Sequence, residues 1–219
     1  MPQLDVYRLN SNIFLYFRHL CYFCRVNRHQ HTKSVVIEAS KEVFKQRGYN
    51  DITMDDIAKA CGKGRSTLYH YFKNKEEVFE EWAMGEFFKL YDKAAARTSS
   101  TLNLEHNLQR YYEAMLIEIS MLIKEYPKLH ADLKMQDAPL LRIQSRATGF
   151  ERKKIKQLLE WAVENKEIRP KDDRDMDYLS LATVTAFASL NMEMILFGSV
   201  EDLTSKLFWI ISILVKGLQ

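Results

Sequence analysis

The chain has 219 residues, of which 47% are apolar and 28% charged, with only seven Gly and four Pro. This composition is typical of a globular, helix-rich protein and excludes a disordered or a fibrous one. The sequence has no uncharged apolar run of about 18 residues or more that could span a bilayer, so we expect a cytoplasmic protein.

The net charge of +3 is unevenly distributed along the chain. Residues 1–31 carry four Arg and one Asp, and residues 32–75 carry nine Lys or Arg against five acidic residues, which leaves a net charge of −4 for residues 76–219. A basic N-terminal third on an acidic remainder suggests that one end of the protein meets a polyanion. An ordinary solvated surface with an uneven charge is the alternative.

Apolar residues recur at helical spacing along the chain beyond its N-terminal segment, and they predict an all-α fold with about nine helices. A first helix is expected over 32–47, because Gly48 is a suitable residue to stop it. Thr53 precedes Asp56 by three residues in a capping-box-like pattern that starts a short second helix. The polar stretch 98–101 is an internal boundary. Further helices are expected over 63–72, 75–97, 103–125, 128–145, 150–166, 173–197 and 200–217.

The stretch GRSTLYHYFK, residues 64–73, carries a polar and aromatic face opposite two apolar anchors, Leu68 and Phe72. Three helices with a short Gly-containing turn before the third match a helix-turn-helix, whose second helix of the pair enters the major groove of DNA. The residues expected to reach base edges are Arg65, Ser66 and Tyr69. The residues expected to contact phosphates are Thr67, His70, Tyr71 and Lys75.

Residues 35–82 contain a specific pattern that runs without a gap. Its members are Phe44, Gly48, Tyr49, Thr53, Ile57, Ala58, Gly62, Thr67, Leu68, Tyr69, Phe72, Lys75 and Glu76. This pattern resembles the N-terminal DNA-binding domain of the tetracycline-repressor (TetR) family of bacterial regulators, whereas the remainder of the chain resembles the family only in its layout. The resemblance implies a DNA-binding domain over 32–78 and a helical ligand-binding and dimerisation domain over 79–219.

The turn before the expected recognition helix departs from the family. After Gly62 the family usually has an apolar residue and then a Ser or Thr cap, where this chain has Lys63 and Gly64. A Gly cap costs only about a few tenths of a kcal/mol of helix stability relative to Ser. The Lys63 side chain can instead contact a phosphate of the DNA backbone. With Thr53, these two residues complete the expected DNA-binding surface, and their identity bears on base preference more than on DNA binding itself.

The last two expected helices are apolar around most of their circumference, so each must be buried on more than one side. In this family the last two helices pair with their copies in a second chain as a four-helix bundle. The residues expected at this homodimer interface are Ala182, Ala186, Leu203, Leu207, Ile210, Ile211 and Leu214, whereas Phe208, Trp209, Ile213 and Val215 lie outside the stripe. Burial within a single chain is the alternative.

The resemblance also implies a pocket for a small-molecule effector among the central helices. The candidates for its wall are Phe87, Phe88, Tyr91, Tyr111, Tyr112, Met115, Ile119, Trp161, Phe187 and Met192. Aromatic and Met residues at helical spacing are more often plain core. No cluster of charges stands out as a counter-ion for a ligand, and no cofactor or metal is expected.

Family resemblance and the reciprocity of coupling together predict a repressor that a small lipophilic ligand releases from a palindromic operator. Control by a protein partner, or activation in place of repression, is the alternative. The common motifs of hydrolases, zinc proteases and phosphate-binding loops are missing from the sequence, so we expect no enzymatic activity.

Residues 1–31 fit nothing in the family. Cys21 and Cys24 precede His29 and His31, but the spacing between the second Cys and the first His is much shorter than in a zinc finger. Translation from an alternative start at Val26 would make the preceding residues an over-extended gene start. A basic arm that touches DNA is a further interpretation.

Overall fold

The structure is a computed structural model that describes residues 29–133, 137–169, 172–197 and 203–219. The interpretations given for the N-terminal segment, a zinc site at Cys21 and Cys24, a basic arm or an over-extended gene start, lie outside these residues.

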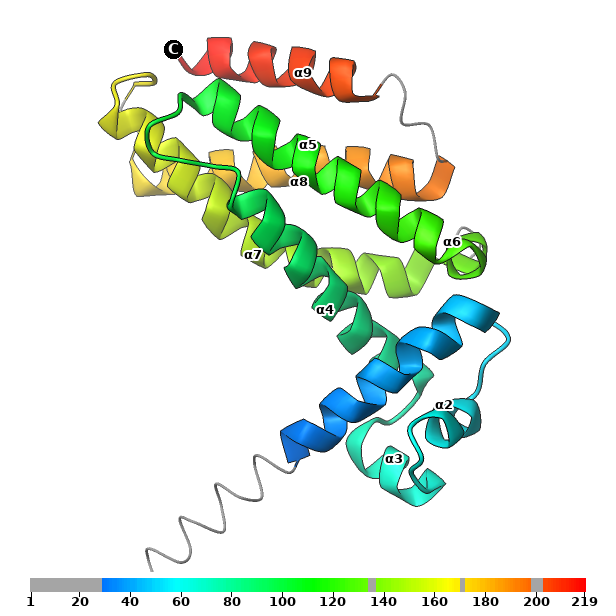
Figure 1. The fold of residues 1–219 in the computed structure, drawn as a ribbon. Helices are drawn as coiled ribbons and strands as arrows, with labels where there is room; N and C mark the ends of the chain where they lie inside the picture. Colours follow the sequence, from blue (N-terminus) through cyan, green and yellow to red (C-terminus); the bar gives the residue numbers. More distant parts are fainter. Residues whose placement is uncertain (1–28, 134–136, 170–171, 198–202) are drawn as a thin grey trace, which may run out of the picture.

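The described residues form nine helices and contain no strand, so the all-α prediction is confirmed. The first helix covers 29–47 and is followed by α2 (Met54–Ala60), α3 (Arg65–Tyr71), α4 (Lys75–Ala95), α5 (Leu104–Glu125), α6 (Pro127–Leu133), α7 (Asp137–Glu164), α8 (Asp173–Phe197) and α9 (Leu203–Leu218). The first helix, α2 and α3 form a head at one end of the long α4, and α5 to α9 form a body around its other end (Figure 1). Within the described ranges, no helix is both long and apolar enough to cross a membrane.

Local capping sets the boundaries of the short helices in the head. The Thr53 hydroxyl accepts a hydrogen bond from the Asp56 N–H, and the Asp56 carboxylate accepts one from the Thr53 N–H, which confirms the capping box. Gly64 is the N-cap of α3 and contributes no side-chain hydrogen bond. Asn74 caps α4 by accepting a hydrogen bond from the Glu77 N–H at 2.9 Å. These caps fix where α3 begins and where the chain turns into α4.

α4 belongs to both hydrophobic cores of the molecule. Its first turns bury Val78 and Phe79 in the core of the head, and its last turns bury Leu90 and Ala94 in the core of the body. Because a single helix of 21 residues enters both cores, the head cannot turn relative to the body without disturbing the packing of α4.

α5 lies at the centre of the body and contacts α4, α7, α8 and α9. Tyr112 of α5 is buried and stacks on Phe187 of α8, with the ring centroids 4.1 Å apart. The polar stretch 98–101 belongs to the connection between α4 and α5, where the buried Asn107 side chain exchanges two hydrogen bonds with the Ser99 backbone, both at 2.9 Å. This stretch is therefore a turn inside the body.

One long helix, α7, differs from the helices predicted from the sequence. In place of the expected helices over 128–145 and 150–166, the described residues form α6, which ends at Leu133, and α7, which begins at Asp137 and continues through Gly149. A Gly inside a helix costs about 1 kcal/mol relative to Ala. Packing of α7 against α4 and α8 outweighs this local preference.

α6 holds the head against the body through one carboxylate. Asp132 Oδ2 accepts hydrogen bonds from the backbone N–H groups of Tyr49 and Asn50, at 2.6 and 3.0 Å. Next to them Gly48 has a φ of +79°, and a Cβ atom at this position would lie 2.3 Å from Asp132 Oδ2. Gly48 therefore ends the first helix in the left-handed conformation and also leaves the space that α6 needs.

Gly48→Ala is expected to lower the free energy of unfolding by about 2 kcal/mol or more, because the added Cβ strains the backbone and displaces Asp132. Gly85→Ala is the matched control, since Gly85 is exposed inside α4 and its added Cβ would meet nothing within 4 Å. This control is expected to raise the free energy of unfolding by about 0.5–1 kcal/mol. Urea denaturation measures both values, and equal effects would contradict the role given to Gly48.

Candidate nucleic-acid interface and adjoining cavity

α3 is fixed to the head on one side and open to solvent on the other. Leu68 at its centre and Phe72 after its last turn are buried in the core of the head, with exposed fractions of 0% and 1%. The exposed residues of α3 are Arg65, Ser66, Thr67, Tyr69 and His70. A short helix anchored in this way presents its polar side as a rigid surface.

Arg65, in the first turn of α3, has a side chain that is held only by exposed interactions. Its Nη1 donates to Asp55 Oδ2 at 3.0 Å, and its guanidinium lies 5.5 Å from the centroid of the Tyr69 ring. The side chain remains 66% exposed. An ion pair this exposed contributes about 0–1 kcal/mol, so Arg65 can exchange Asp55 for another hydrogen-bond acceptor at little energetic cost.

The end of α3 lies beside the start of the first helix. The His29 ring stacks on Tyr71 with centroids 4.6 Å apart, and it lies 6.3 Å from the His70 ring. His70 is exposed and Tyr71 half-buried. The first helix therefore supports the aromatic end of α3 and places His29 next to the surface predicted to contact phosphates.

The other residues of the predicted surface flank α3. Thr53 is exposed, but its hydroxyl also donates to Asp56 Oδ2 at 2.7 Å and is engaged in the cap of α2. Lys63 and Gly64 are exposed in the turn, where the Lys63 N–H donates to the Ala58 carbonyl at 3.0 Å. The turn that departs from the family pattern is thus closed by backbone hydrogen bonds.

Lys75 has a different role from the one predicted for its side chain. Its ammonium donates to the carbonyl oxygens of Tyr49, Asn50 and Ile52, at 2.8, 3.3 and 3.0 Å, and lies 4.6 Å from the centroid of the Tyr49 ring. The three donors of an ammonium group are then all engaged by the loop before α2. The structure thus gives this side chain a structural role inside the head, and the predicted phosphate contact would require it to leave these carbonyl groups.

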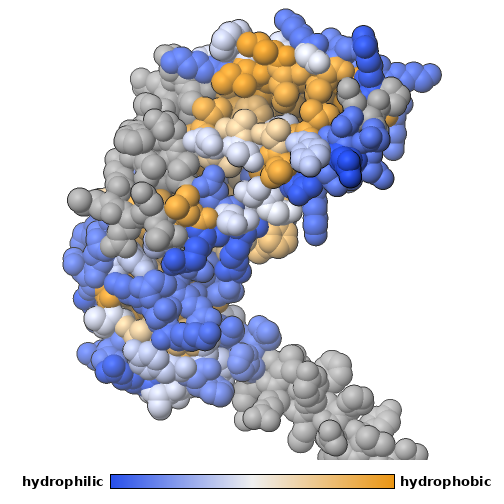
Figure 2. All heavy atoms as spheres, turned by 180° about the vertical axis from the view of Figure 1, so that it is seen from behind, coloured by the Kyte–Doolittle hydropathy of each residue, from blue (hydrophilic) through white to orange (hydrophobic). Residues whose placement is uncertain are grey.

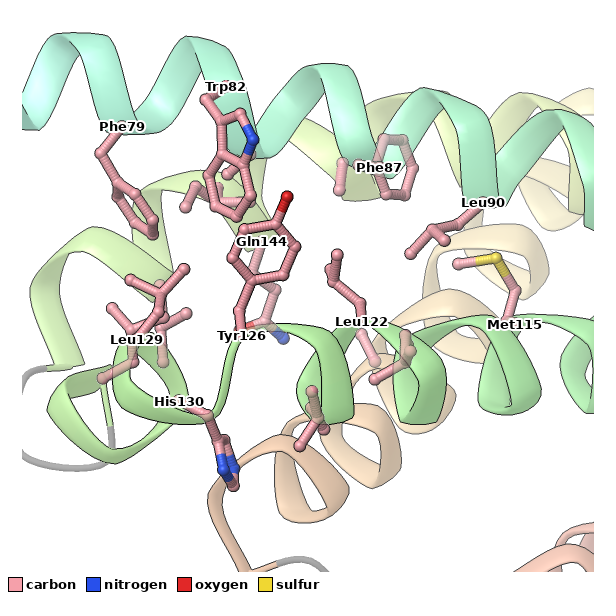
Figure 3. A pocket seen from close by; sticks show the side chains of 18 of the residues that line it. Phe79, Trp82, Phe87, Leu90, Met115, Leu122, Tyr126, Leu129, His130 and Gln144 are labelled. Atoms are coloured by element: carbon pink, nitrogen blue, oxygen red, sulfur yellow. The ribbon is translucent and has the colours of Figure 1, made fainter. Parts of the chain in front are cut away.

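A cavity of about 180 Å³ lies where the head meets the body, between α4, α5, α6, α7 and α8. Figure 3 shows Trp82 and Phe87 of α4 facing Leu122 and Tyr126 across the space between α4 and α5. Most of its wall is apolar. An engineered apolar cavity of about 150 Å³ binds benzene, so this space is large enough for a compact apolar molecule. The polar side chains of the wall are Tyr126, His130, Gln144, Thr148 and Glu151, and Trp82 Nε1 is buried with no hydrogen-bond partner among the described residues.

Glu151 is a buried carboxylic acid in this wall. Its exposed fraction is 4%, and its Oε1 accepts a hydrogen bond from the Tyr111 hydroxyl at 3.4 Å. Burial raises the pKa of the Glu151 carboxyl to about 7, and the hydrogen bond from Tyr111 opposes this shift only in part. Among the residues that the structure describes, Glu151 takes part in no ion pair.

The predicted pocket residues are only partly found in this wall. Phe87, Met115 and Ile119 line the cavity. The others are placed elsewhere: Tyr111, Tyr112 and Phe187 in the core of the body, Tyr91 and Trp161 half-buried against that core, and Phe88 partly exposed against Phe150. The side chain of Met192 lies outside the described residues. The cavity lies closer to the head than predicted, because the two adjacent tyrosines of α5 pack against α8.

Sequence reasoning missed several residues of the wall, most of them near the head: Phe79, Trp82, Tyr126, Leu129, His130, Gln144 and Glu151. One of them does leave a signal in the sequence. Glu151 occupies the position between Ala147 and Ile155 at spacings of four, and both neighbours are buried. A charged residue at a core position of an amphipathic helix indicates a buried charge.

α6 lies between the cavity and the head. Leu129, His130 and Leu133 of this helix line the cavity. From the same helix, Lys128 Nζ donates to the Gln46 carbonyl at 2.7 Å, and Asp132 accepts the hydrogen bonds from the loop after the first helix. A molecule that pushes on α6 from the cavity therefore acts directly on the end of the first helix.

Apolar side chains gather on the part of the body that lies away from the head (Figure 2). On α9, Trp209 and Ile213 are 65% and 51% exposed. On α8 the exposed stripe consists of Tyr178, Leu181, Ala182, Thr185, Ala186 and Ser189. An apolar surface of this kind marks an interaction site.

This distribution corrects the predicted interface stripe of α9. Leu207 and Ile211 are buried in the core of their own chain, with Ile210 and Leu214 half-buried against it. The side chain of Leu203 lies outside the described residues. Because α9 is apolar all round, the sequence could not show which side faces α5. Of the four residues placed outside the stripe, Trp209 and Ile213 are exposed, Phe208 is half-buried and Val215 is buried.

Comparison with known proteins identifies the head. Residues 36–82 match the model of the bacterial regulatory proteins of the tetR family. The uncharacterized HTH-type transcriptional regulator YhgD of Bacillus subtilis is 36% identical over 84 residues, which are 38% of this chain and 44% of that protein. The HTH-type negative transcriptional regulator IcaR of the biofilm operon icaADBC of Staphylococcus epidermidis is 33% identical over 49 residues, 22% of this chain and 26% of that protein. The chain thus matches less than half the length of these curated relatives.

The fold extends the likeness beyond the head. A transcriptional regulator from Cytophaga hutchinsonii superimposes with a TM-score of 0.61 at 20% identity, over 85% of this chain and 97% of that chain. At this identity the comparison concerns the fold alone, and it shows that the head, α4 and the body are arranged as in that solved structure.

Lys75→Met is expected to lower the free energy of unfolding by about 1–2 kcal/mol, because three carbonyl groups lose their charged donor. Lys73→Met is the matched control, since Lys73 is exposed two residues earlier. Thermal and urea denaturation of the two variants measure the difference. Unchanged stability of Lys75→Met, together with a salt dependence of DNA binding that is weaker by about one phosphate contact, would restore the phosphate role.

Proposed function

Residues 36–82 make the head of this chain a member of the tetR family of bacterial regulatory proteins, and we propose that the whole chain is a homodimeric repressor that reads a palindromic operator. The observation that carries this proposal is the anchored α3, with its exposed polar side and Arg65 in its first turn. The relatives are transcriptional regulators, and the proposal includes no enzymatic activity. The protein acts in the cytoplasm, where its operator is.

Base edges and phosphates are contacted by different residues of the head. Arg65 leaves Asp55 and donates to the O6 and N7 atoms of a guanine in the major groove, with Ser66 and Tyr69 beside it. The phosphate contacts, which position the head without reading sequence, come from Thr53, Lys63, Gly64, Thr67, His70 and Tyr71 and from the backbone N–H groups at the start of α4.

The second copy of the chain covers the exposed apolar side chains of α8 and α9. A twofold axis there places the same surface of both chains in contact. Small residues such as Ala182 and Ala186 let the helix backbones approach closely, and Trp209 and Ile213 supply the buried area. The two heads then reach half-sites that are separated by about one helical turn of DNA, or a multiple of it. In this division residues 32–78 bind DNA, and 79–219 bind the ligand and form the dimer.

A small lipophilic ligand in the cavity releases the protein from DNA. The ligand displaces α6, on which Leu129 and Leu133 face the cavity and Asp132 holds the loop after the first helix. A displaced α6 moves the head that it contacts, and the separation of the two heads in the dimer changes. DNA binding then weakens, because two half-sites fit only one separation. Since coupling is reciprocal, a ligand that binds better when the heads are displaced must weaken operator binding by the same factor.

Footprinting on the DNA upstream of its own gene tests this function. The wild-type protein is expected to protect a palindrome, with protection that falls steeply with salt. Arg65→Ala is expected to lose about 1–3 kcal/mol of discrimination at one base pair of each half-site, whereas Lys63→Ala weakens binding to all sequences and reduces the salt slope by about one per head. If Arg65→Ala kept both affinity and base preference, the assignment of the reading side of α3 would be wrong.

Trp209→Glu is expected to convert the dimer into a monomer, because the new carboxylate would be buried without a partner in the interface. Ile117→Glu, on an exposed site of α5 with an exposed fraction of 53%, is the control and keeps the dimer. Light scattering after size exclusion gives the mass of each variant. A dimer that persists in Trp209→Glu would exclude this side of α9 from the interface.

A further inference from the structure

The cavity wall combines an apolar surface with one acidic group. Glu151 is held on α7 with 4% of its surface exposed, and among the described residues its carboxylate accepts one hydrogen bond, from Tyr111 at 3.4 Å. A carboxylate accepts about four hydrogen bonds when it is ionised. Most of the bonding capacity of this group is therefore unused, although the residue lines a space large enough for a ligand.

Burial of the Glu151 carboxyl costs the folded chain stability. This carboxyl has a pKa of about 7, raised from 4.5, so burial disfavours the charged form. Because the pKa is raised on folding, the folded state has its full stability below about pH 4.5 and loses part of it as the pH rises through about 7. A Gln at this position would have similar size and no such cost, so the packing of the chain does not explain why an acid is present.

The surroundings of Glu151 are suited to a positive charge. The titratable groups around it are tyrosines, Tyr91 on α4 and Tyr111 and Tyr112 on α5, which are neutral at pH 7 because burial raises their pKa values further. His130 of α6 lines the same cavity, and Ala188 is the part of its wall that comes from the described side chains of α8. No Lys or Arg is among the described residues that line this wall.

The cavity wall also contains aromatic rings, whose faces can bind a cation. Phe79, Trp82, Phe87 and Tyr126 line the cavity. The faces of such rings attract a desolvated ammonium group by about 1–2 kcal/mol each in favourable cases. A carboxylate ligand would meet the negative charge of Glu151 here, and a neutral ligand would leave that group without a partner.

We propose that the effector of this protein is a lipophilic cation, a compact apolar molecule with one ammonium group that pairs with the Glu151 carboxylate inside the cavity. This assignment rests on the proposed function, because it makes the cavity the effector site. The ammonium group supplies the counter-ion that Glu151 lacks among the residues that the structure describes. Trp82 Nε1, which is buried and has no partner among the described residues, can donate to a neutral acceptor on the same ligand.

Two probes of the same shape distinguish the contribution of the positive charge to the affinity from the contribution of shape. Benzyltrimethylammonium carries a permanent positive charge, and neopentylbenzene is its neutral isostere. Binding to the full chain without DNA is followed by Trp fluorescence, since Trp82 lines the cavity. With a pKa of about 7, Glu151 is ionised to about one tenth at pH 6 and about nine tenths at pH 8. The cation is therefore expected to bind about tenfold more tightly at pH 8 than at pH 6, whereas the affinity for neopentylbenzene stays nearly constant.

Glu151→Gln provides the matched variant. It is expected to bind the cation at least tenfold more weakly at pH 8, to lose the pH dependence, and to keep its affinity for neopentylbenzene. Its melting temperature is expected to exceed that of the wild type at pH 8 and to equal it near pH 4, which shows that the variant is folded. Equal affinities of the wild type for both probes, or cation binding that Glu151→Gln leaves unchanged, would overturn the inference.

A footprint in the presence of each probe distinguishes failure of this inference from failure of the proposed function. Loss of operator protection with benzyltrimethylammonium in the wild type, but not in Glu151→Gln, supports both. Operator protection that the bound cation leaves intact overturns the effector assignment, and the DNA-binding function stands. A chain that binds the cation and protects no operator overturns the regulatory role itself.

Discussion

Four aromatic side chains form the contact on which the position of the head depends. Phe44 of the first helix packs on Phe79 and Trp82 of α4, with ring centroids 5.4 Å apart in both pairs. Trp82 in turn packs on Tyr126, which follows α5, at 5.1 Å. Rings in edge-to-face or tilted contact bury a large area in a defined geometry. The head is thus joined to the body by a packed core and not by a flexible linker.

The same cluster makes the cavity and the head parts of one mechanical unit. Phe79, Trp82 and Tyr126 are both members of this junction and residues of the cavity wall. On the opposite side, α6 carries Asp132 to the loop after the first helix. Well-packed interiors have few intermediate arrangements, so a change in the cavity favours a discrete shift of the head over a gradual one. A cavity located at the junction therefore needs no long path to reach the DNA-binding surface.

The sequence predicted those features of the fold that depend on neighbouring residues. The capping box of Thr53 and Asp56 and the stop at Gly48 each follow from local backbone hydrogen bonding, and both are present. The prediction of α3 from the sequence has the same local basis, because its two apolar anchors, Leu68 and Phe72, lie four residues apart. The helices of α6 and α7 were misjudged, since long-range packing against α4 and α8 decides whether Gly149 interrupts a helix.

Features that depend on contacts between distant segments were predicted less well. Leu207 and Ile211 form an apolar stripe that suits an interface, but the stripe faces α5 of the same chain. When a helix is apolar on all sides, its sequence does not show which side packs against its own chain and which side is left for a partner. Similarly, Lys75 was assigned to a phosphate because its position at a helix start is visible in the sequence, whereas the carbonyl groups that bind it come from residues 49–52.

At Glu151 the hydrophobic periodicity of α7 and the residue type lead to opposite predictions of burial. Ala147 and Ile155 continue the buried stripe of α7 on either side of it, so the helical period alone assigns this position to the core. Residue type alone assigns it to the surface. In the structure Glu151 is buried, as the helical period predicts, and its carboxyl lies in an apolar wall at a cost to stability. Local rules fail most informatively at functional sites, and a single acid that breaks the pattern beside a cavity identifies the group that a ligand has to satisfy.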